Sequence, residues 1–299
     1  MKRARLFFLA LTSALVVRLV GARGLVVTPT QLGLVGKPGA TVSGVIRVGA
    51  AREEKTAVKV TVTDFTKDED GQLRENPPSG VARSCRNWLR VDQENFFAPG
   101  GGMAELRVTA RIPADAQGSY WALVGLEVPP PPRKPGAGTL GIAVVPRVAV
   151  GVFVTADGTV KRQVRVAAIT AHKKADEPVE VVATIENAGN AAVLVSGSFT
   201  LERPGTKGAD TVELASKDVG PVTSLPGNRL RLRAKLDWTG SVADLQVHSY
   251  LRYGPEPEDG AESATSIEVE GPAAPKPGGE RLIPETPLTS TPVPTWPPR

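Results

Sequence analysis

Few side chains of this sequence belong to types that carry out chemistry. The chain has two histidines and one cysteine. His172 and His248 lie far apart, and neither has a second histidine or a cysteine at the spacing of metal ligands. A lone cysteine such as Cys85 is more often a small buried hydrophobe than a reactive thiol. Because nucleophile-elbow, phosphate-loop and metalloprotease motifs are also missing, we expect no enzyme, no cofactor and no metal site.

The acidic segment Asp68–Gly71 resembles a calcium-binding loop only in part. If Gly71 were the sixth residue of such a loop, Pro77 would occupy the twelfth position, where a bidentate glutamate is needed. Asp70-Gly71 instead predicts a tight hairpin turn. One enzyme alternative stays open, because the two carboxylates of a glycosidase can meet in three dimensions without any sequence motif.

A row of basic residues suggests a second kind of chemistry, the binding of an anionic polymer. Its members alternate with apolar residues and therefore share one face of a predicted strand. Residues 159–270 nevertheless contain 13 basic and 16 acidic residues, and a solvated outer face is the competing interpretation. Polysaccharide binding is our alternative hypothesis, and it rests on Arg229, Arg231, Arg233 and Lys235.

Residues 1–22 have the pattern of a secretory signal peptide. Lys2, Arg3 and Arg5 precede an apolar run, and small residues follow it. The whole chain has 36 basic and 31 acidic residues, so removal of the four basic residues in this segment leaves a formal charge of only +1. We therefore predict an exported protein of the periplasm or the cell surface, with no nucleic-acid partner and no integral membrane span.

Short apolar-alternating segments separated by turn residues predict an all-β protein. Arg86–Val91 is one expected strand, whereas His172 falls in an expected turn. We predict two tandem immunoglobulin-like β-sandwiches, because each part contains several short strands with turn signals between them. The expected division is a domain over 23–158, a second domain over 159–270 and a disordered Pro-rich tail over 271–299.

The longest period-2 pattern, from Thr139 to Val154, is too long for one ordinary strand, so we expect a break at Pro146 and predict an edge there that can bind another protein. Its apolar residues occupy even positions, so they share one face. Pro146 cannot donate to a strand ladder, which favours a sheet edge. Such an edge is either covered within its own domain or offered to a partner. The candidate protein-binding residues are Leu140, Ile142, Val144, Arg147, Val148 and Val150.

The order of several short motifs resembles a known family. The motifs Ser84–Leu89, Phe96–Gly101, Ile112–Tyr120 and Ile185–Asn190 follow one another as in bacterial envelope proteins related to periplasmic pilus-assembly chaperones and to the interactors of WxL surface proteins. The resemblance covers about residues 25–270. It implies export, two β domains and another envelope or surface protein as the partner.

Two positions depart from the pilus chaperones that the sequence resembles. Those proteins anchor a subunit's terminal carboxylate on an arginine in the first strand and a lysine in the last strand of the first domain. Here Thr28–Leu32 contains no arginine, and the lysine position holds Ala149, with Arg147 as the nearby cation. We therefore expect a non-catalytic protein-binding module, a periplasmic chaperone or surface-assembly factor, that uses the exposed edge strand of its first domain.

Overall fold

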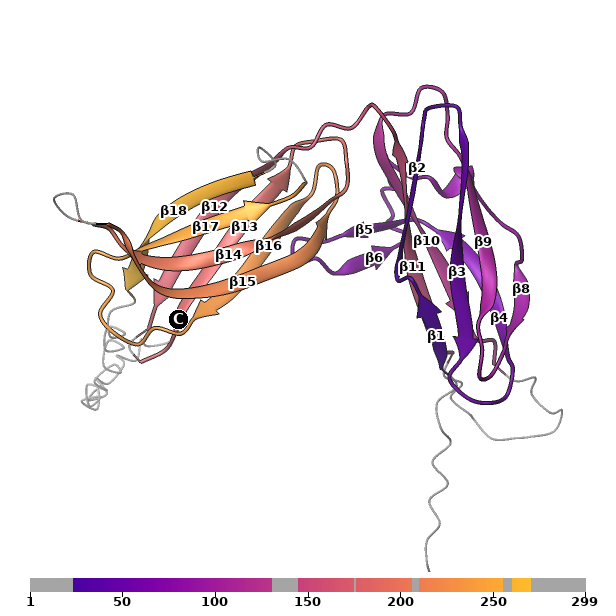
Figure 1. Ribbon diagram of the computed structural model, residues 1–299, viewed down its shortest axis with the longest axis horizontal. Helices are drawn as coiled ribbons and strands as arrows, with labels where there is room; N and C mark the ends of the chain where they lie inside the picture. The colour runs from indigo at the N-terminus through magenta and orange to yellow at the C-terminus, as the bar shows by residue number, and fades with distance from the viewer. Residues whose placement is uncertain (1–23, 131–144, 175, 206–209, 255–259, 270–299) are drawn as a thin grey trace, which may run out of the picture.

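The structure is a computed structural model that describes residues 24–130, 145–174, 176–205, 210–254 and 260–269. Two β-sandwiches lie side by side along the chain and meet at a steep angle (Figure 1). The prediction of an all-β fold with two immunoglobulin-like domains is confirmed. The expected signal peptide and the Pro-rich tail lie outside the described residues.

The first domain packs two sheets face to face and adds one hairpin. One sheet has the order β1 (Leu25–Thr28), β3 (Thr41–Ala50), β9 (Ala104–Arg111) and β7 (Leu89–Val91). The other has the order β2 (Gln31–Gly36), β11 (Arg147–Ala156), β10 (Gly118–Glu127), β4 (Thr56–Thr63) and β8 (Asn95–Ala98). The separate hairpin consists of β5 (Phe65–Lys67) and β6 (Leu73–Glu75). The Asp70-Gly71 turn predicted from the sequence closes this hairpin.

The apolar alternation of β11 builds the core of the first domain. Val150, Val152 and Val154 are fully buried between the sheets, so the even positions of β11 share the inner face. Burial of each such side chain stabilises the fold by about 1.5–3 kcal/mol. Ile46 of β3 and Leu106 of β9 meet them from the opposite sheet and belong to the same cluster. The period-2 pattern therefore fixes which face of this strand points inward.

The second domain is one continuous set of seven paired strands. Strand β18 pairs with β12 on one side and with β17 on the other, so it joins the two layers. The order is β15 (Val212–Ser224), β14 (Val193–Arg203), β17 (Gln246–Arg252), β18 (Gly260–Val269), β12 (Val164–Lys173), β13 (Val179–Asn187) and β16 (Arg229–Leu236). Strands β15 and β16 are consequently the two edges of the set.

Two local predictions were wrong. The segment Arg86–Val91 is a strand only in its second half, because the 3₁₀ helix η1 (Arg86–Trp88) precedes β7. His172 lies in strand β12 rather than in a turn, since the residues around it pair with β13 and β18. In both places polar or basic residues interrupt the apolar pattern on which the predictions depended.

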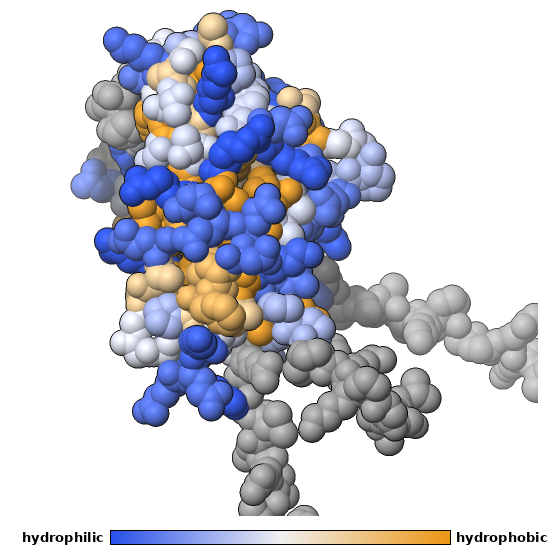
Figure 2. All heavy atoms as spheres, turned by 90° about the vertical axis from the view of Figure 1, so that its right-hand side faces the viewer, coloured by the Kyte–Doolittle hydropathy of each residue, from blue (hydrophilic) through white to orange (hydrophobic). Residues whose placement is uncertain are grey.

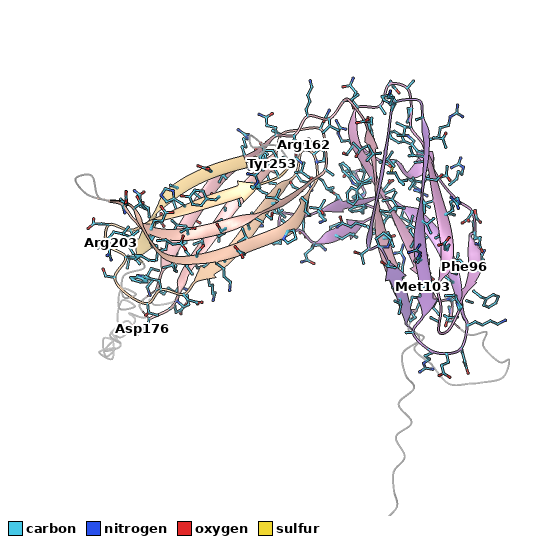
Figure 3. The ribbon with its side chains drawn as sticks, in the orientation of Figure 1. Phe96, Met103, Arg162, Asp176, Arg203 and Tyr253 are labelled. Carbon is cyan, nitrogen blue, oxygen red and sulfur yellow. The ribbon has the colours of Figure 1, made fainter. Side chains whose placement is uncertain are left out.

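Exposed apolar side chains gather at the end of the first domain that lies far from the second domain. Phe97 and Met103 are 61% and 42% exposed. Figure 3 labels Met103 and the neighbouring Phe96 at this end. Seen from the side turned away from the second domain, hydrophilic residues cover most of the surface, with hydrophobic side chains exposed between them (Figure 2). Among the described residues, no helix is long and apolar enough to cross a membrane.

Candidate functional site

Among the residues that the structure describes, no strand pairs with one edge of β11 over its first four residues, and we call this segment the open edge. Its neighbour β2 pairs only with Gly151–Ala156, although β11 begins at Arg147. The Gly151 N–H donates to the Thr30 carbonyl at 3.2 Å, and the preceding strand β1 belongs to the other sheet. Backbone N–H and C=O groups two residues apart along a strand point to the same side. The N–H and C=O groups of Ala149 and Arg147 therefore point to the side on which β2 pairs further along the strand.

The structure places three of the six predicted protein-binding residues at this edge. Val150 is fully buried and Val148 is half-buried on the same face of the strand, whereas Arg147 lies on the outer face. Strand β11 is internal to its sheet from Gly151 onward, so the edge is limited to the first four residues of the strand. Leu140, Ile142 and Val144 lie outside the described residues.

The Arg147 side chain crosses the outer face of the sheet and binds a carboxylate of the hairpin. Its Nη2 atom lies 2.6 Å from Glu75 Oε1, and Nη1 binds the other oxygen of the same carboxylate. Gly125 allows this path, because a Cβ atom there would lie 2.4 Å from Arg147 Nη2. The Arg147 guanidinium holds the pKa of Glu75 below its ordinary value, with a smaller contribution from the Thr63 hydroxyl. The cation nearest the open edge is therefore neutralised within the domain.

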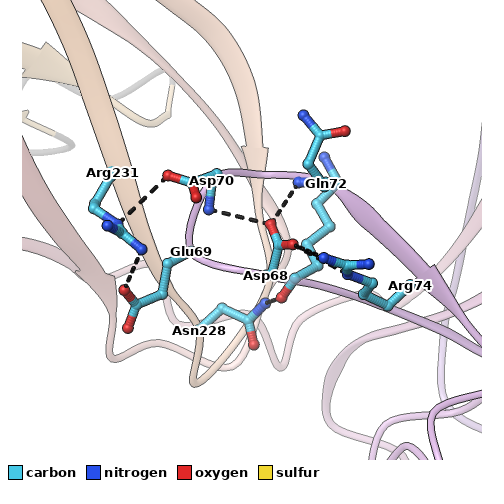
Figure 4. Close-up of polar contacts among 8 residues, drawn as sticks. Asp68, Glu69, Asp70, Gln72, Arg74, Asn228 and Arg231 are labelled. Carbon is cyan, nitrogen blue, oxygen red and sulfur yellow. Dashed lines mark hydrogen bonds and ion pairs between the residues drawn. The ribbon is translucent and has the colours of Figure 1, made fainter.

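The tip of the β5–β6 hairpin binds the second domain (Figure 4). The Arg231 N–H of edge strand β16 donates to the Glu69 carbonyl at 2.6 Å. The Arg231 side chain also lies 3.0 Å from Glu69 Oε2 and 3.5 Å from Asp70 Oδ1. Asn228 Nδ2 donates to the Lys67 carbonyl at 2.8 Å, just before β16. The hairpin thus covers part of an edge that would otherwise expose backbone groups.

Hydrogen bonds to Asp68 also connect the residues at the tip of the hairpin. Asp68 accepts hydrogen bonds from the Gln72 N–H at 2.8 Å and from Arg74 Nη2 at 2.9 Å. These contacts lower the pKa of Asp68, with the Gln72 N–H as the main cause. Because Glu75 at the base of the hairpin binds Arg147, one short element contacts both the open edge of β11 and the second domain.

A small apolar cluster supports the junction of the two domains. Phe65 of β5 and Trp121 and Leu123 of β10 pack with Leu225, which lies in the turn between β15 and β16. The Trp121 indole N–H donates to the Phe65 carbonyl at 2.9 Å, so the base of the hairpin is fixed to the first domain. All four side chains are at least 96% buried, which makes this contact the apolar centre of the interface.

The basic stripe of the second domain is present on one face of β16, but carboxylates of the chain accompany its arginines. Arg229 lies 3.8 Å from Glu186 on the adjacent strand β13. Arg233 lies 3.4 Å from Asp70, so it shares that carboxylate with Arg231. Lys235 is exposed at the end of the stripe. The sequence could not reveal this neutralisation, because Glu69 and Asp70 come from the other domain.

The residue types that could carry out chemistry remain separated. No group of three or more potential metal ligands occurs among the residues that the structure describes. His172 lies 3.3 Å from Glu268, and His248 lies 3.6 Å from Glu202 in a different part of the second domain. Cys85 is completely buried, and this burial raises the pKa of its thiol well above the ordinary range. A buried thiol of this kind is not poised as a nucleophile.

The fold and the open edge define a protein of two tandem immunoglobulin-like domains. No protein-family model matches the chain, and no curated protein matches it. Similar solved structures include the class 5 fimbriae chaperone CfaA, with 13% identity, coverage of 81% of this chain and 99% of that chain, and a TM-score of 0.40. They also include the E. coli chaperone DraB, with 12% identity, coverage of 77% and 92%, and a TM-score of 0.39.

A third similar structure is the Pseudomonas aeruginosa CupB2 chaperone. It is 14% identical, with coverage of 82% of this chain and 100% of that chain and a TM-score of 0.36. The similarity to these three chaperones is one of fold.

Proposed function

We propose that this chain is a non-catalytic, exported protein-binding module that adds a strand of another envelope or surface protein to the open edge of β11. The observation that carries the proposal is that β2 pairs with β11 only from Gly151 onward. The Arg147 and Ala149 backbone groups then offer donors and acceptors to an extended segment. Strand addition of this kind gains affinity from main-chain hydrogen bonds and specificity from alternate side-chain contacts.

The surroundings of the edge favour an apolar partner strand. Val148 is half-buried on the inner face, so an added strand would cover it from the side. Val145, just before β11, is 38% exposed, and Val26 on β1 is 49% exposed. Because the pair with Glu75 leaves little free charge on Arg147, apolar contacts and backbone hydrogen bonds would dominate the binding free energy. A chaperone or surface-assembly factor is the role that fits such a surface.

The substitution Ala149→Pro tests this proposal, because proline removes the N–H group that faces the open edge. Ala149→Ser is the matched control, since it keeps the N–H group and adds only one oxygen atom. A photo-crosslinker at position 145, just before β11, should capture the partner in the intact envelope. Hydrogen exchange of the purified complex should then show protection of the Arg147 and Ala149 amides. Thr109, on the outer face of the other sheet, is the control crosslinking position.

We expect Ala149→Pro to abolish the crosslinked complex, whereas Ala149→Ser keeps it. The melting temperature of the first domain must stay within a few degrees in both variants. A partner that binds Ala149→Pro as well as it binds the native chain would overturn the proposal. Equal crosslinking from positions 145 and 109 would do the same, because it would indicate contact without a preferred edge.

Binding of an anionic polymer is not favoured as a second function. Arg229, Arg231 and Arg233 each lie within 4 Å of a carboxylate of the chain. A polymer would have to displace Glu69 and Asp70 from the domain junction before it reached two of these arginines. The competition lowers the expected affinity of the stripe for an external anion.

A further inference from the structure

A pocket of about 580 Å³ opens on the first domain. It lies where the turn between β2 and β3, the 3₁₀ helix η1 and the end of β9 meet. Strand β9 belongs to the sheet opposite to the one that carries the open edge. The Gly39 N–H donates to the Ile112 carbonyl at 3.1 Å and so holds the turn against the end of β9. Gly39, Trp88, Arg90, Arg111 and Ile112 are among the residues that line the pocket.

Two arginines give this pocket a positive charge. Arg90 of β7 is paired in register with Thr109 of β9, and Arg111 lies two residues further along β9 on the same face. The two residues are therefore diagonal neighbours, which lie about 7–8 Å apart across a strand pair. Within the described part of the chain neither arginine takes part in an ion pair, and no acidic residue lines the pocket. Like charges on neighbouring strands repel one another, and an anion placed between them would relieve the repulsion.

Trp88 supplies a flat apolar wall next to these charges. Its ring packs against Tyr120, with ring centroids 4.3 Å apart, and Arg83 covers the Tyr120 ring at 5.3 Å. The Trp88 ring is thereby held in place but stays half-exposed toward the pocket. Ile112 extends the apolar surface of the pocket. A rigid aromatic wall beside two guanidinium groups fits a ligand that combines a ring with an oxyanion.

We propose that this pocket binds a small organic oxyanion in which a carboxylate or a phosphate is attached to a ring. The ring stacks on Trp88, and the oxyanion accepts hydrogen bonds from Arg90 and Arg111. Pockets of this volume hold ligands of drug size, which is sufficient for one such molecule. The site is separate from the open edge of β11, so it adds a small-molecule ligand to the proposed protein-binding function.

NMR titration of the mature full-length chain with phenyl phosphate and benzoate tests the proposal. The two compounds distinguish a phosphate from a carboxylate source, whereas inorganic phosphate and benzyl alcohol supply the charge and the ring alone. We expect at least one ring-bearing anion to shift the Trp88 indole N–H signal with saturation. The affinity of this ring-bearing anion should exceed the affinities of inorganic phosphate and of benzyl alcohol by about tenfold, because the ring contact and the charge contact act together.

Three substitutions complete the experiment. Arg90→Gln and Arg111→Gln should each weaken the ring-bearing anion about tenfold, since each removes a charge-assisted contact. Trp88→Leu, followed by the Gly39 backbone N–H signal because its indole is gone, should remove the advantage of the ring-bearing anion over inorganic phosphate. Arg47→Gln is the matched control, because Arg47 lies in the same sheet but binds Glu105 at 3.3 Å. The absence of a saturable Trp88 shift with either compound would overturn the proposal. An equal loss of affinity in Arg47→Gln would also overturn it, because only general surface charge would then be at work.

Discussion

Glu69 and Arg231 join the two domains through both their backbones and their side chains. The Glu69 carbonyl accepts the Arg231 N–H at 2.6 Å, and Glu69 Oε2 lies 3.0 Å from Arg231 Nη2. The backbone contact adds one hydrogen bond to the edge of strand β16, and the side-chain contact adds an ion pair between the same two residues. Because two independent contacts converge on one residue pair, the hairpin tip has a defined position on the second domain.

The substitution Arg231→Gln should loosen this junction without unfolding either domain. Its side chain is 36% exposed, so loss of its ion pairs should lower the free energy of unfolding by only about 1 kcal/mol. The backbone hydrogen bond to Glu69 can remain, but the Arg231 amide should exchange its hydrogen faster. Hydrogen exchange measured by NMR, together with small-angle scattering of the whole chain, would show both effects.

Arg165→Gln is the control for this change. Arg165 binds Glu186 at 2.8 Å within the second domain, so its loss should leave the junction unaltered. The interpretation fails if both variants change the scattering profile to the same extent. It also fails if the backbone amide of residue 231 is as protected in Arg231→Gln as in the native chain.

Gly118 and Gly158 have similar backbone conformations, but only Gly118 lies at the contact between the domains. A comparison of alanine variants at the two positions distinguishes the cost of backbone strain from the cost of the lost contact. Gly118 and Gly158 have φ angles of +71° and +77°, which are unfavourable for any residue with a Cβ atom. A Cβ atom on Gly118 would lie 2.1 Å from the Asn190 carbonyl oxygen in the second domain, whereas at Gly158 it would meet nothing within 4 Å. We expect Gly158→Ala to cost about 1–2 kcal/mol. Gly118→Ala should cost more, because the domain contact must also shift.

Thermal or denaturant unfolding of the two variants would measure this difference. The Ser119 N–H, which donates to the Asn190 carbonyl at 2.9 Å, serves as a local probe. It should lose protection from hydrogen exchange in Gly118→Ala but not in Gly158→Ala. Equal destabilisation with equal protection would mean that the contact at Asn190 adds nothing beyond local strain.

The strands that were predicted from the sequence are those with one buried apolar face. Strand β11 shows this pattern at Val150, Val152 and Val154, and β16 shows it at Leu230 and Leu232. Strand β18 was not predicted, because none of its residues is fully buried and most of them are small or polar. Its position depends on pairing with both β12 and β17. The local sequence pattern of a strand carries no information about its partners.

The candidate site was only partly predictable for a similar reason. The position of Arg147 at an edge follows from Pro146 and the apolar alternation around it. Its partner Glu75 could not be inferred, because the two residues meet only when the hairpin folds over the sheet. The pocket between Trp88 and Arg111 was also missed, since the sequence predicted a regular strand over residues 86–91 where η1 forms. Long-range contacts between elements decide such sites, and periodicity reports only on each element alone.

Cys85 should not react with thiol reagents in the folded protein. Its side chain is completely buried, and burial raises the pKa of the thiol well above the ordinary range. The reactive thiolate is therefore scarce at neutral pH, and reagents cannot reach it. Labelling with a chromogenic disulfide should proceed only as fast as the first domain opens, and it should be rapid in denaturant. Fast stoichiometric labelling of the native chain would contradict the burial.

The ion pair between Glu75 and Arg147 should make the stability of the first domain sensitive to acid. The pKa of Glu75 in the folded protein lies below its ordinary value of 4.5, mainly because of the hydrogen bonds from Arg147. The ionised form is thus preferred in the folded state. Its stabilising contribution is complete above about pH 4.5 and is lost as the pH falls through the lowered pKa. Carboxyl NMR signals and melting temperatures recorded over this range would follow the loss.

In Glu75→Gln we expect a lower melting temperature at neutral pH and a smaller decrease on acidification, because the amide cannot titrate. Glu105→Gln is the matched control, since Glu105 pairs with Arg47 on the surface, with side chains 56% and 62% exposed. That variant should follow the native pH profile, because exposed pairs contribute little. Arg147 should also become mobile in Glu75→Gln, and the open edge of β11 would then carry a free cation. A Glu75 carboxyl signal that titrates at or above pH 4.5 would show that Arg147 does not hold this carboxylate in solution.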